Sequence, residues 1–314
     1  MVPKGNRKEK PPPKLGDAAD LSPRSFGMTG SSMTAQALIV VAAFTLLGYT
    51  MPKLSVLSRD GAIDVLHRLS VGKARFKELF LVVSNTRTLT RRLKELLEEG
   101  LIEKAGASYK ITSEGFETTI KIAELEGNAK QRPVNYEELL KLRHGWMRIS
   151  LRRLVEFFHE EFGEELISIV LYGSAVKGSF QLGKSDIDLL YILKDSPKNV
   201  WQRERRVFKD FQSIWEYRAG DNWLRTQGTY GYPEVTTAWL QKMDAMKFQP
   251  IYLDMLSDRA ILYDTELFFQ SLMKKLEEVL EALGTIRIEH PDGTYLWFLK
   301  PNIAPGEEIE INLG

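Results

Sequence analysis

The sequence predicts an α+β protein with at least two domains, and three observations support this. The 314 residues have ordinary apolar and charged fractions of 43% and 27%, which suits two domains with appendages. Residues 53–126 have the spacing of short amphipathic helices followed by a hairpin. Residues 167–172 and 185–190 are instead apolar segments typical of buried strands. We therefore expect a small, mainly helical unit followed by a unit built around a sheet.

The first fifty residues differ in composition from the rest of the chain. Residues 1–32 are rich in Pro, Gly, Lys and Ser, so we expect them to be disordered. Residues 35–49 are almost entirely apolar, but this run is shorter than the ~20 residues that a membrane-spanning helix needs. A cytoplasmic protein is the favoured prediction, with membrane anchoring through residues 35–49 as one alternative. Another is that the natural chain begins at Met51, directly before the globular pattern.

Composition also excludes several kinds of site. The chain contains no Cys, so it has no disulfide, thiolate metal site or Cys nucleophile. Its four His residues are scattered and lack metal-ligand spacing. Because the formal net charge is only +1, any contact with nucleic acid requires a local basic patch.

Residues 53–126 predict three helices and a β-hairpin. The third helix, residues 86–99, places leucines on one side, and Gly100 is positioned to end it. The hairpin follows at residues 101–111 and another helix begins near Thr112. The opposite side of the third helix carries the basic residues Arg87, Arg91, Arg92 and Lys94. The strings TLTRRLKELLEEGLIEK and YKITSEG resemble winged helix-turn-helix regulators, and the resemblance covers the whole segment.

This resemblance implies that the third helix enters the major groove of DNA, with basic side chains on the phosphates. The candidate DNA-binding residues lie in its first two turns: Thr86, Arg87, Thr88, Thr90 and Arg91. Two alternatives remain open. The basic face is simply solvated, or the unit binds protein and pairs two copies of the chain as a homodimer.

The central motif lies between residues 167 and 190. An apolar strand ends at a Gly173-Ser174 turn that opens a helix, and a second apolar strand begins with Asp186 and Asp188. Because side chains two apart on a strand face the same way, these carboxylates converge. Hard oxygen ligands suit Mg²⁺ or Mn²⁺, and a glycine lets backbone amides approach a phosphate closely. The free N–H groups and the dipole of the following helix would attract the same anion.

In this order, the two halves resemble the signature of the DNA polymerase β-type nucleotidyltransferase superfamily, especially its minimal members. The resemblance implies a small mixed sheet, Asp186 and Asp188 as catalytic metal ligands, and an NTP held near the turn. The candidate nucleotide-binding residues are Gly173, Ser174, Lys177 and Ser185. A solvated lysine is the alternative for Lys177.

The superfamily generally has a third acid on a neighbouring strand after an intervening helix. Residues 197–219 predict that helix and residues 235–240 that strand. Glu234, at the start of the strand, is our candidate for the third catalytic carboxylate, with Asp244 and Asp254 as alternatives. An Asp at the centre of the strand is absent.

The remaining segments complete the predicted organisation. A long helix at residues 136–162 should pack on the sheet, residues 260–264 form a final strand, and a helix spans residues 265–283. Turn residues within residues 286–298 predict a hairpin. The whole arrangement resembles archaeal-type fusion proteins. The expected units are a leader (1–50), a winged helix (53–126), a linker (127–135), a nucleotidyltransferase domain (136–285) and a hairpin with tail (286–314).

We therefore predict a metal-dependent nucleotidyltransferase that moves an NMP group from an NTP to a hydroxyl and releases pyrophosphate. The acceptor could be a protein, a nucleic-acid end or a small molecule. The alternative is a DNA-binding regulator whose second domain senses nucleotides and is catalytically weak.

Overall fold

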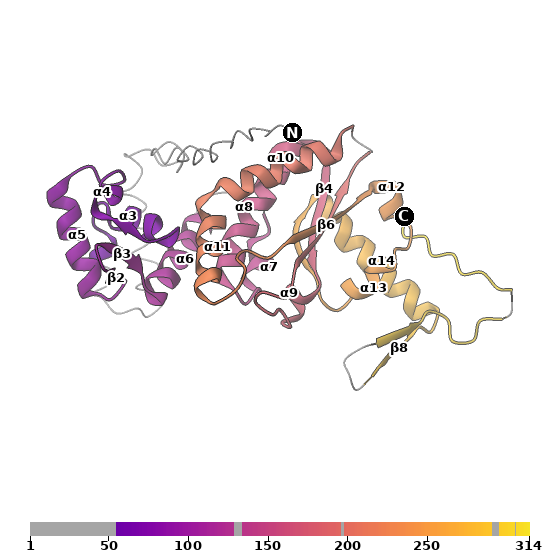
Figure 1. Ribbon diagram of the computed structural model, residues 1–314. Helices are drawn as coiled ribbons and strands as arrows, with labels where there is room; N and C mark the ends of the chain where they lie inside the picture. Colours follow the sequence, from indigo (N-terminus) through magenta and orange to yellow (C-terminus); the bar gives the residue numbers. More distant parts are fainter. Residues whose placement is uncertain (1–54, 129–133, 196–197, 291–294, 305) are drawn as a thin grey trace, which may run out of the picture.

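The computed structural model describes residues 55–128, 134–195, 198–290, 295–304 and 306–314 (Figure 1). The leader and its apolar run at residues 35–49 lie outside the described residues. Among the helices that are described, none combines the length and apolar character required to cross a bilayer.

The N-terminal unit consists of helices around a small sheet. Its buried side chains come from every helix and include Leu66, Leu89 and Leu96. The strands pair antiparallel in the order β1-β3-β2. The elements are α3 (Ala62–Ser70), β1 (Ala74–Arg75), α4 (Phe76–Leu79), α5 (Thr86–Glu98), β2 (Ile102–Ala105), β3 (Ser108–Ile111) and α6 (Ser113–Asn128).

Arg92 was predicted to lie on the exposed basic face of α5, and this prediction is wrong. Arg92 is buried rather than exposed, because its guanidinium donates to the Asp60 carbonyl at 2.7 Å and pairs with Glu95. Helical spacing put Arg92 beside Arg91, but the loop before α3 folds over this position. Arg92 therefore stabilises the unit and belongs to no binding face.

A four-stranded mixed sheet forms the centre of the second unit, as the sequence predicted. Its strands are β4 (Leu166–Tyr172), β5 (Ile187–Leu193), β6 (Val235–Gln241) and β7 (Ala260–Asp264). They lie in the order β6-β5-β4-β7, with β5 and β6 parallel and the other pairs antiparallel. The end of β4 and the beginnings of β5, β6 and β7 therefore lie at one edge of the sheet.

Helices cover both faces of this sheet (Figure 1). One face packs against α8 (Gly145–Phe162), α10 (Val200–Ser213) and α11 (Trp215–Thr226) through residues such as Leu189 and Tyr191. The other packs against α12 (Lys242–Ala245), α13 (Ile251–Met255) and α14 (Phe268–Ala282) through Leu190 and Ile192. Alternating side chains of β5 thus enter two separate cores.

Two predicted helices are each broken in the structure. The expected helix 136–162 is α7 (Tyr136–Leu140) and α8, separated at His144, whose backbone is extended. Gly145 is required there because a Cβ would collide with Ile120 on α6. The expected helix 197–219 is α10 and α11, separated at Ile214, which is also extended. Neither break follows from a Pro or a strong turn signal, so hydrophobic spacing alone could not locate them.

The N-terminal unit packs against α8 and α11 of the second unit. The His67 ring stacks on Trp215 with centroids 4.3 Å apart, and Phe116 stacks on Trp223 at 5.5 Å. Asn222 donates to the Ser70 carbonyl at 3.1 Å, and Arg148 donates to Glu124 at 2.6 Å. Apolar and polar contacts both cross this interface.

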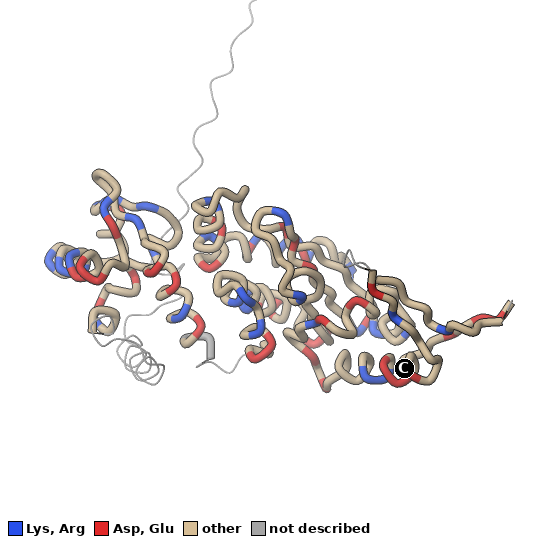
Figure 2. The backbone as a smooth tube through the Cα atoms, turned by 90° about the horizontal axis from the view of Figure 1, so that it is seen from below, with Lys and Arg blue, Asp and Glu red and all other residues tan. Residues whose placement is uncertain are grey.

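The predicted C-terminal hairpin is present as β8 (Ile286–Glu289) and β9 (Tyr295–Phe298), which pair antiparallel. Beyond it, Ile311 and Leu313 return to the core beside α14. Figure 2 shows basic and acidic residues interleaved along the backbone, in keeping with a near-neutral chain.

Candidate active site at the edge of the mixed sheet

The Gly-Ser turn lies directly against Asp188, one of the two aspartates. Gly173 follows β4 with φ 75°, a conformation that glycine adopts readily. A Cβ at this position would overlap Asp188 Oδ2. Gly173 is therefore required twice, once for its backbone angles and once to leave space for the carboxylate.

Strand register explains where the aspartates point. Asp188 pairs with Tyr172, and both side chains face the core of α13 and α14, as do Leu190 and Ile192. Asp186 lies one residue before β5 and is exposed, whereas Asp188 is half-buried. Because Asp186 and Asp188 are two positions apart, their carboxylates lie on the same side of the strand, beside the turn.

The electrostatics of this pair are unfavourable without a cation. Burial raises the pKa of the Asp188 carboxyl, and the charge of Asp186 raises that pKa further. Within the described part of the chain, no hydrogen bond or ion pair compensates either carboxylate. Oxygen ligands with uncompensated negative charge fit Mg²⁺ or Mn²⁺ chemically.

The other predicted nucleotide-binding residues lie on or near the turn. Ser174 is half-buried at the start of α9 (Ser174–Lys177), and Lys177 is exposed at its end. The Ser185 hydroxyl accepts a hydrogen bond from the Gln181 amide at 3.0 Å, so it shapes the loop before β5. Because α9 is one turn long, its dipole is smaller than expected from sequence, and anion binding falls to the free amides of that turn.

The third carboxylate is less well placed. Glu234 directly precedes β6, its carbonyl accepts from the Ile187 amide at 2.9 Å, and its side chain is exposed. The parallel register sets it next to Asp186. Among the described residues, however, no three acidic or imidazole side chains converge closely enough to hold a metal ion.

The two alternative acids lie at opposite ends of the sheet. Asp244 is on α12, beyond the far end of β6, where it pairs with Lys247 at 2.8 Å. It cannot share an ion with Asp186. Asp254 is on α13, at the same edge as the turn. Burial raises the pKa of Tyr172, and the charges of Asp188 and Asp254 raise it further.

Tyr172 and Tyr295 were not anticipated as part of this region. The sequence shows Tyr172 only as the end of an apolar strand, although its register with Asp188 follows once the sheet is known. Tyr295 lies 118 residues from Lys177, to which its hydroxyl is hydrogen-bonded, and no sequence pattern connects the two.

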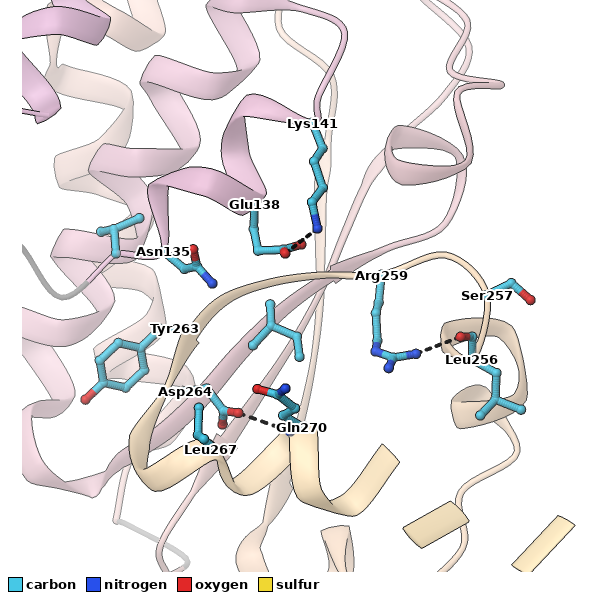
Figure 3. Close-up of a pocket in the computed structure, with 12 residues that line it drawn as sticks. Asn135, Glu138, Lys141, Leu256, Ser257, Arg259, Tyr263, Asp264, Leu267 and Gln270 are labelled. Atoms are coloured by element: carbon cyan, nitrogen blue, oxygen red, sulfur yellow. Dashed lines mark hydrogen bonds and ion pairs between the residues drawn. The ribbon is translucent and has the colours of Figure 1, made fainter. Parts of the chain in front are cut away.

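A large cavity of about 710 Å³ lies elsewhere, along β7 (Figure 3). Its lining includes Glu138 of α7, Lys141 directly after that helix, and Arg259, which donates to the Leu256 carbonyl at 2.7 Å. Neither the Gly-Ser turn nor the paired aspartates contribute to it. The cavity is therefore separate from the candidate active site.

The candidate DNA-binding residues lie on the exposed part of α5. Thr86, Arg87, Thr90 and Arg91 are exposed, and Thr88 is half-buried with its amide bonded to Asn85 Oδ1 at 2.9 Å. Arg91 pairs with Glu95 at 3.0 Å. Arg87 has no such partner in the part of the chain that the structure describes.

Comparison with known families adds the decisive observation. Residues 151–224 match the family model described as "Nucleotidyltransferase domain". The chain carries a nucleotidyltransferase domain. The matched segment runs from α8 to α11, so it contains the Gly-Ser turn, Asp186 and Asp188 but ends before Glu234.

Two proteins of Methanocaldococcus jannaschii are similar to parts of the chain. One, named "Putative protein adenylyltransferase", is 26% identical over 132 residues, which are 41% of this chain and 80% of that protein. The other, named "Uncharacterized HTH-type transcriptional regulator", is 35% identical over 68 residues, 20% of this chain and 64% of that protein. No solved structure matches the chain significantly. The predicted enzyme class, nucleotidyltransferase, is confirmed.

Proposed function

We propose that this nucleotidyltransferase domain transfers an NMP group from an NTP to a hydroxyl in a reaction that requires a divalent cation. The observation that carries the proposal is the contact between Gly173 and Asp188. This contact supports the proposal because Asp188 lies next to a turn whose first amides have no intrahelical partner and could bind phosphate. Metal ligands and phosphate ligands would then act on one triphosphate.

Asp186 and Asp188 would hold Mg²⁺ or Mn²⁺. Such an ion, when bound, neutralises phosphate charge and lowers the pKa of a coordinated hydroxyl. In the reaction, a bond forms between the acceptor oxygen and the α-phosphorus. The bond between the α-phosphorus and the oxygen that bridges the α- and β-phosphates breaks. The acceptor loses its proton and pyrophosphate leaves. Ser174 and the amides of its turn would bind the phosphates, and Glu234 would orient the acceptor or take its proton.

A protein hydroxyl is the acceptor that we favour, with ATP as the donor, because one similar protein carries the name of a protein adenylyltransferase. The similarity covers 80% of that protein's length. The name gives no target, so the acceptor has to be identified by experiment.

The test incubates the full chain with a cell extract, Mg²⁺ or Mn²⁺, and ATP labelled at the α- or the γ-phosphate. Label should enter an acceptor from α-labelled ATP only, because the γ-phosphate leaves in pyrophosphate. Asp186→Ala and Asp188→Ala should abolish transfer, and protease but not nuclease should degrade the product. Equal transfer from both positions would overturn the proposed reaction, and a nuclease-sensitive product would overturn the protein acceptor.

A second activity, DNA binding by a winged helix, has its own support. The elements of the N-terminal unit follow the order of a winged helix, and its α5 presents Thr86, Arg87, Thr90 and Arg91 to solvent. A similar protein is named as an HTH-type regulator. Affinity for duplex DNA should fall steeply as salt rises, because phosphate contacts release counterions. Salt-independent affinity, or none at low salt, would contradict this role.

A further inference from the structure

The C-terminal hairpin contacts the candidate active site through one side chain. Tyr295 is the first residue of β9, and its hydroxyl lies between two charged groups. Lys177 Nζ donates to that hydroxyl at 3.4 Å, and the hydroxyl donates to Asp254 Oδ1. A hydrogen-bonded chain thus runs from the end of α9 through the hairpin to α13.

The chemistry of the three groups fixes the direction of both bonds. An ammonium can only donate and a carboxylate can only accept, so the phenol must accept from Lys177 and donate to Asp254. Burial and the hydrogen bond to Asp254 raise the pKa of Tyr295, while Lys177 opposes this rise. The phenol therefore keeps its proton at neutral pH, as the arrangement requires.

The position of the Lys177 ammonium indicates a hydrogen bond rather than ring stacking. Nζ is 3.4 Å from the hydroxyl oxygen but 5.4 Å from the ring centroid, so it lies beyond the hydroxyl and not above the ring. The Arg287 guanidinium instead lies over the Tyr295 ring, 4.3 Å from its centroid. It also donates to Ser257 Oγ at 3.2 Å. Arg287 thus holds the ring while the hydroxyl holds the lysine.

This chain of contacts ends beside the turn and the aspartates. Lys177 is the last residue of the helix that begins directly after Gly173. The charge of Asp254 reaches Tyr172, which is paired with Asp188. The hairpin therefore borders the region where the triphosphate would bind.

We propose that Tyr295 is a positioning residue that holds the Lys177 ammonium toward the triphosphate of the bound NTP. The hairpin thereby forms one wall of the nucleotide site. A free lysine side chain on the surface loses rotamer entropy when it is fixed. Tyr295 restricts Lys177 before the nucleotide arrives, so less of that entropy is lost on binding. This proposal rests on the proposed function, since it assumes an NTP beside Gly173.

The test measures equilibrium affinity for ATP with a methylene bridge between the α- and β-phosphates, in the presence of Mg²⁺. This analogue cannot donate an NMP group, so binding is measured without transfer. Tyr295→Phe removes the hydroxyl but keeps the ring under Arg287, and it should weaken binding by up to about tenfold, because an unrestrained Lys177 side chain loses its rotamer entropy when the nucleotide binds. Lys177→Met should weaken binding at least as much.

A double-mutant cycle separates positioning from a general loss of structure. If Tyr295 acts through Lys177, Tyr295→Phe should have no further effect in the Lys177→Met chain. In transfer assays, Tyr295→Phe should raise KM for ATP more than it lowers kcat. Leu296→Ala, at the exposed neighbouring position, is the matched control and should leave affinity and melting temperature unchanged.

The outcomes distinguish this proposal from the function on which it rests. If the unmodified chain does not bind the analogue, the proposed function itself fails. If it binds but Tyr295→Phe has no effect, or has the same effect with and without Lys177, only the positioning role is overturned. An unchanged affinity of Lys177→Met would overturn it equally.

Discussion

Two groups of charged side chains in the nucleotidyltransferase domain are arranged in opposite ways. Between α8 and α11, Arg152 and Arg153 face Glu156 and Glu216, and Glu216 lies 3.8 Å from each arginine. Glu156 also pairs with both arginines. At the edge of the sheet, Asp186 and Asp188 lie two positions apart with no pairing cation among the described residues. One group is balanced and mostly buried, and the other is uncompensated and partly open.

The difference separates charges that hold the fold from charges that are available for binding. Burial raises the pKa of Glu216, and Arg153 and Arg152 offset this rise, so the cluster is stable only when complete. The two aspartates have no such offset. A group that destabilises the empty protein but suits a cation is typical of a functional site.

The largest expected effect comes from neutralising one aspartate. Asp188→Asn should reduce nucleotidyl transfer by at least about a thousandfold, because metal-bound charge stabilisation supplies several kcal/mol. The same change should leave the melting temperature unchanged or slightly raised. Asp188 has a raised pKa in the folded protein, so its ionised form is disfavoured there, and removing the charge relieves that cost at neutral pH. A clear fall in melting temperature would place Asp188 among the structural charges.

The balanced cluster should respond in the reverse manner. Glu216→Ala leaves two arginines with one carboxylate and should lower the free energy of unfolding by about 4 kcal/mol, as measured by denaturant titration. Glu216→Gln is the matched control and should cost less, because it retains an oxygen that accepts hydrogen bonds. Transfer activity per folded molecule should not change. Loss of activity at full stability would show that the comparison between the two groups is wrong.

A third way to avoid uncompensated charge occurs at the interface between the two units. His67 is buried against Trp215, and burial lowers its pKa from 6.5 to about 4. Between these values the unfolded chain binds more protons than the folded one, so stability rises with pH across this window and falls as pH drops through it. The loss from pH 7 to pH 4 should approach about 3 kcal/mol. His67→Phe keeps a ring on Trp215 and should remove this part of the pH dependence. The measurement is the free energy of unfolding of the unmodified chain and of His67→Phe at each pH, and the difference between them.

Sequence reasoning located the elements whose signals are local. The strand before Gly173, the apolar run that contains Asp188 and the turn residues of the C-terminal hairpin all predicted the observed elements. The break at His144 was missed although Gly145 follows it directly, because the contact with Ile120 on α6 that requires this glycine is not visible in the local sequence. At Ile214 no Pro or Gly marks the break.

The site could be predicted only as far as its residues lie close in the sequence. Gly173 and Asp188 are fifteen positions apart and in one motif, so their meeting was foreseeable. The environment of Lys177 was not, since Tyr295 comes from the other end of the domain. Arg92 shows the same limit: helical periodicity predicted an exposed side chain, but the loop that contains Asp60 covers it.

The smallest expected effect applies the comparison to two arginines on one helix face. Arg87 has no ion-pair partner among the described residues, whereas Glu95 pairs with Arg91. Arg87→Ala should weaken DNA binding by about 1 kcal/mol and lower the salt slope by about 1, and Arg91→Ala should have a smaller effect because its charge is already partly neutralised. Fluorescence anisotropy on a labelled duplex gives both quantities, with Lys274→Ala on α14 as the control. A larger loss for Arg91→Ala would show that an ion pair within the helix does not remove an arginine from the DNA-binding surface.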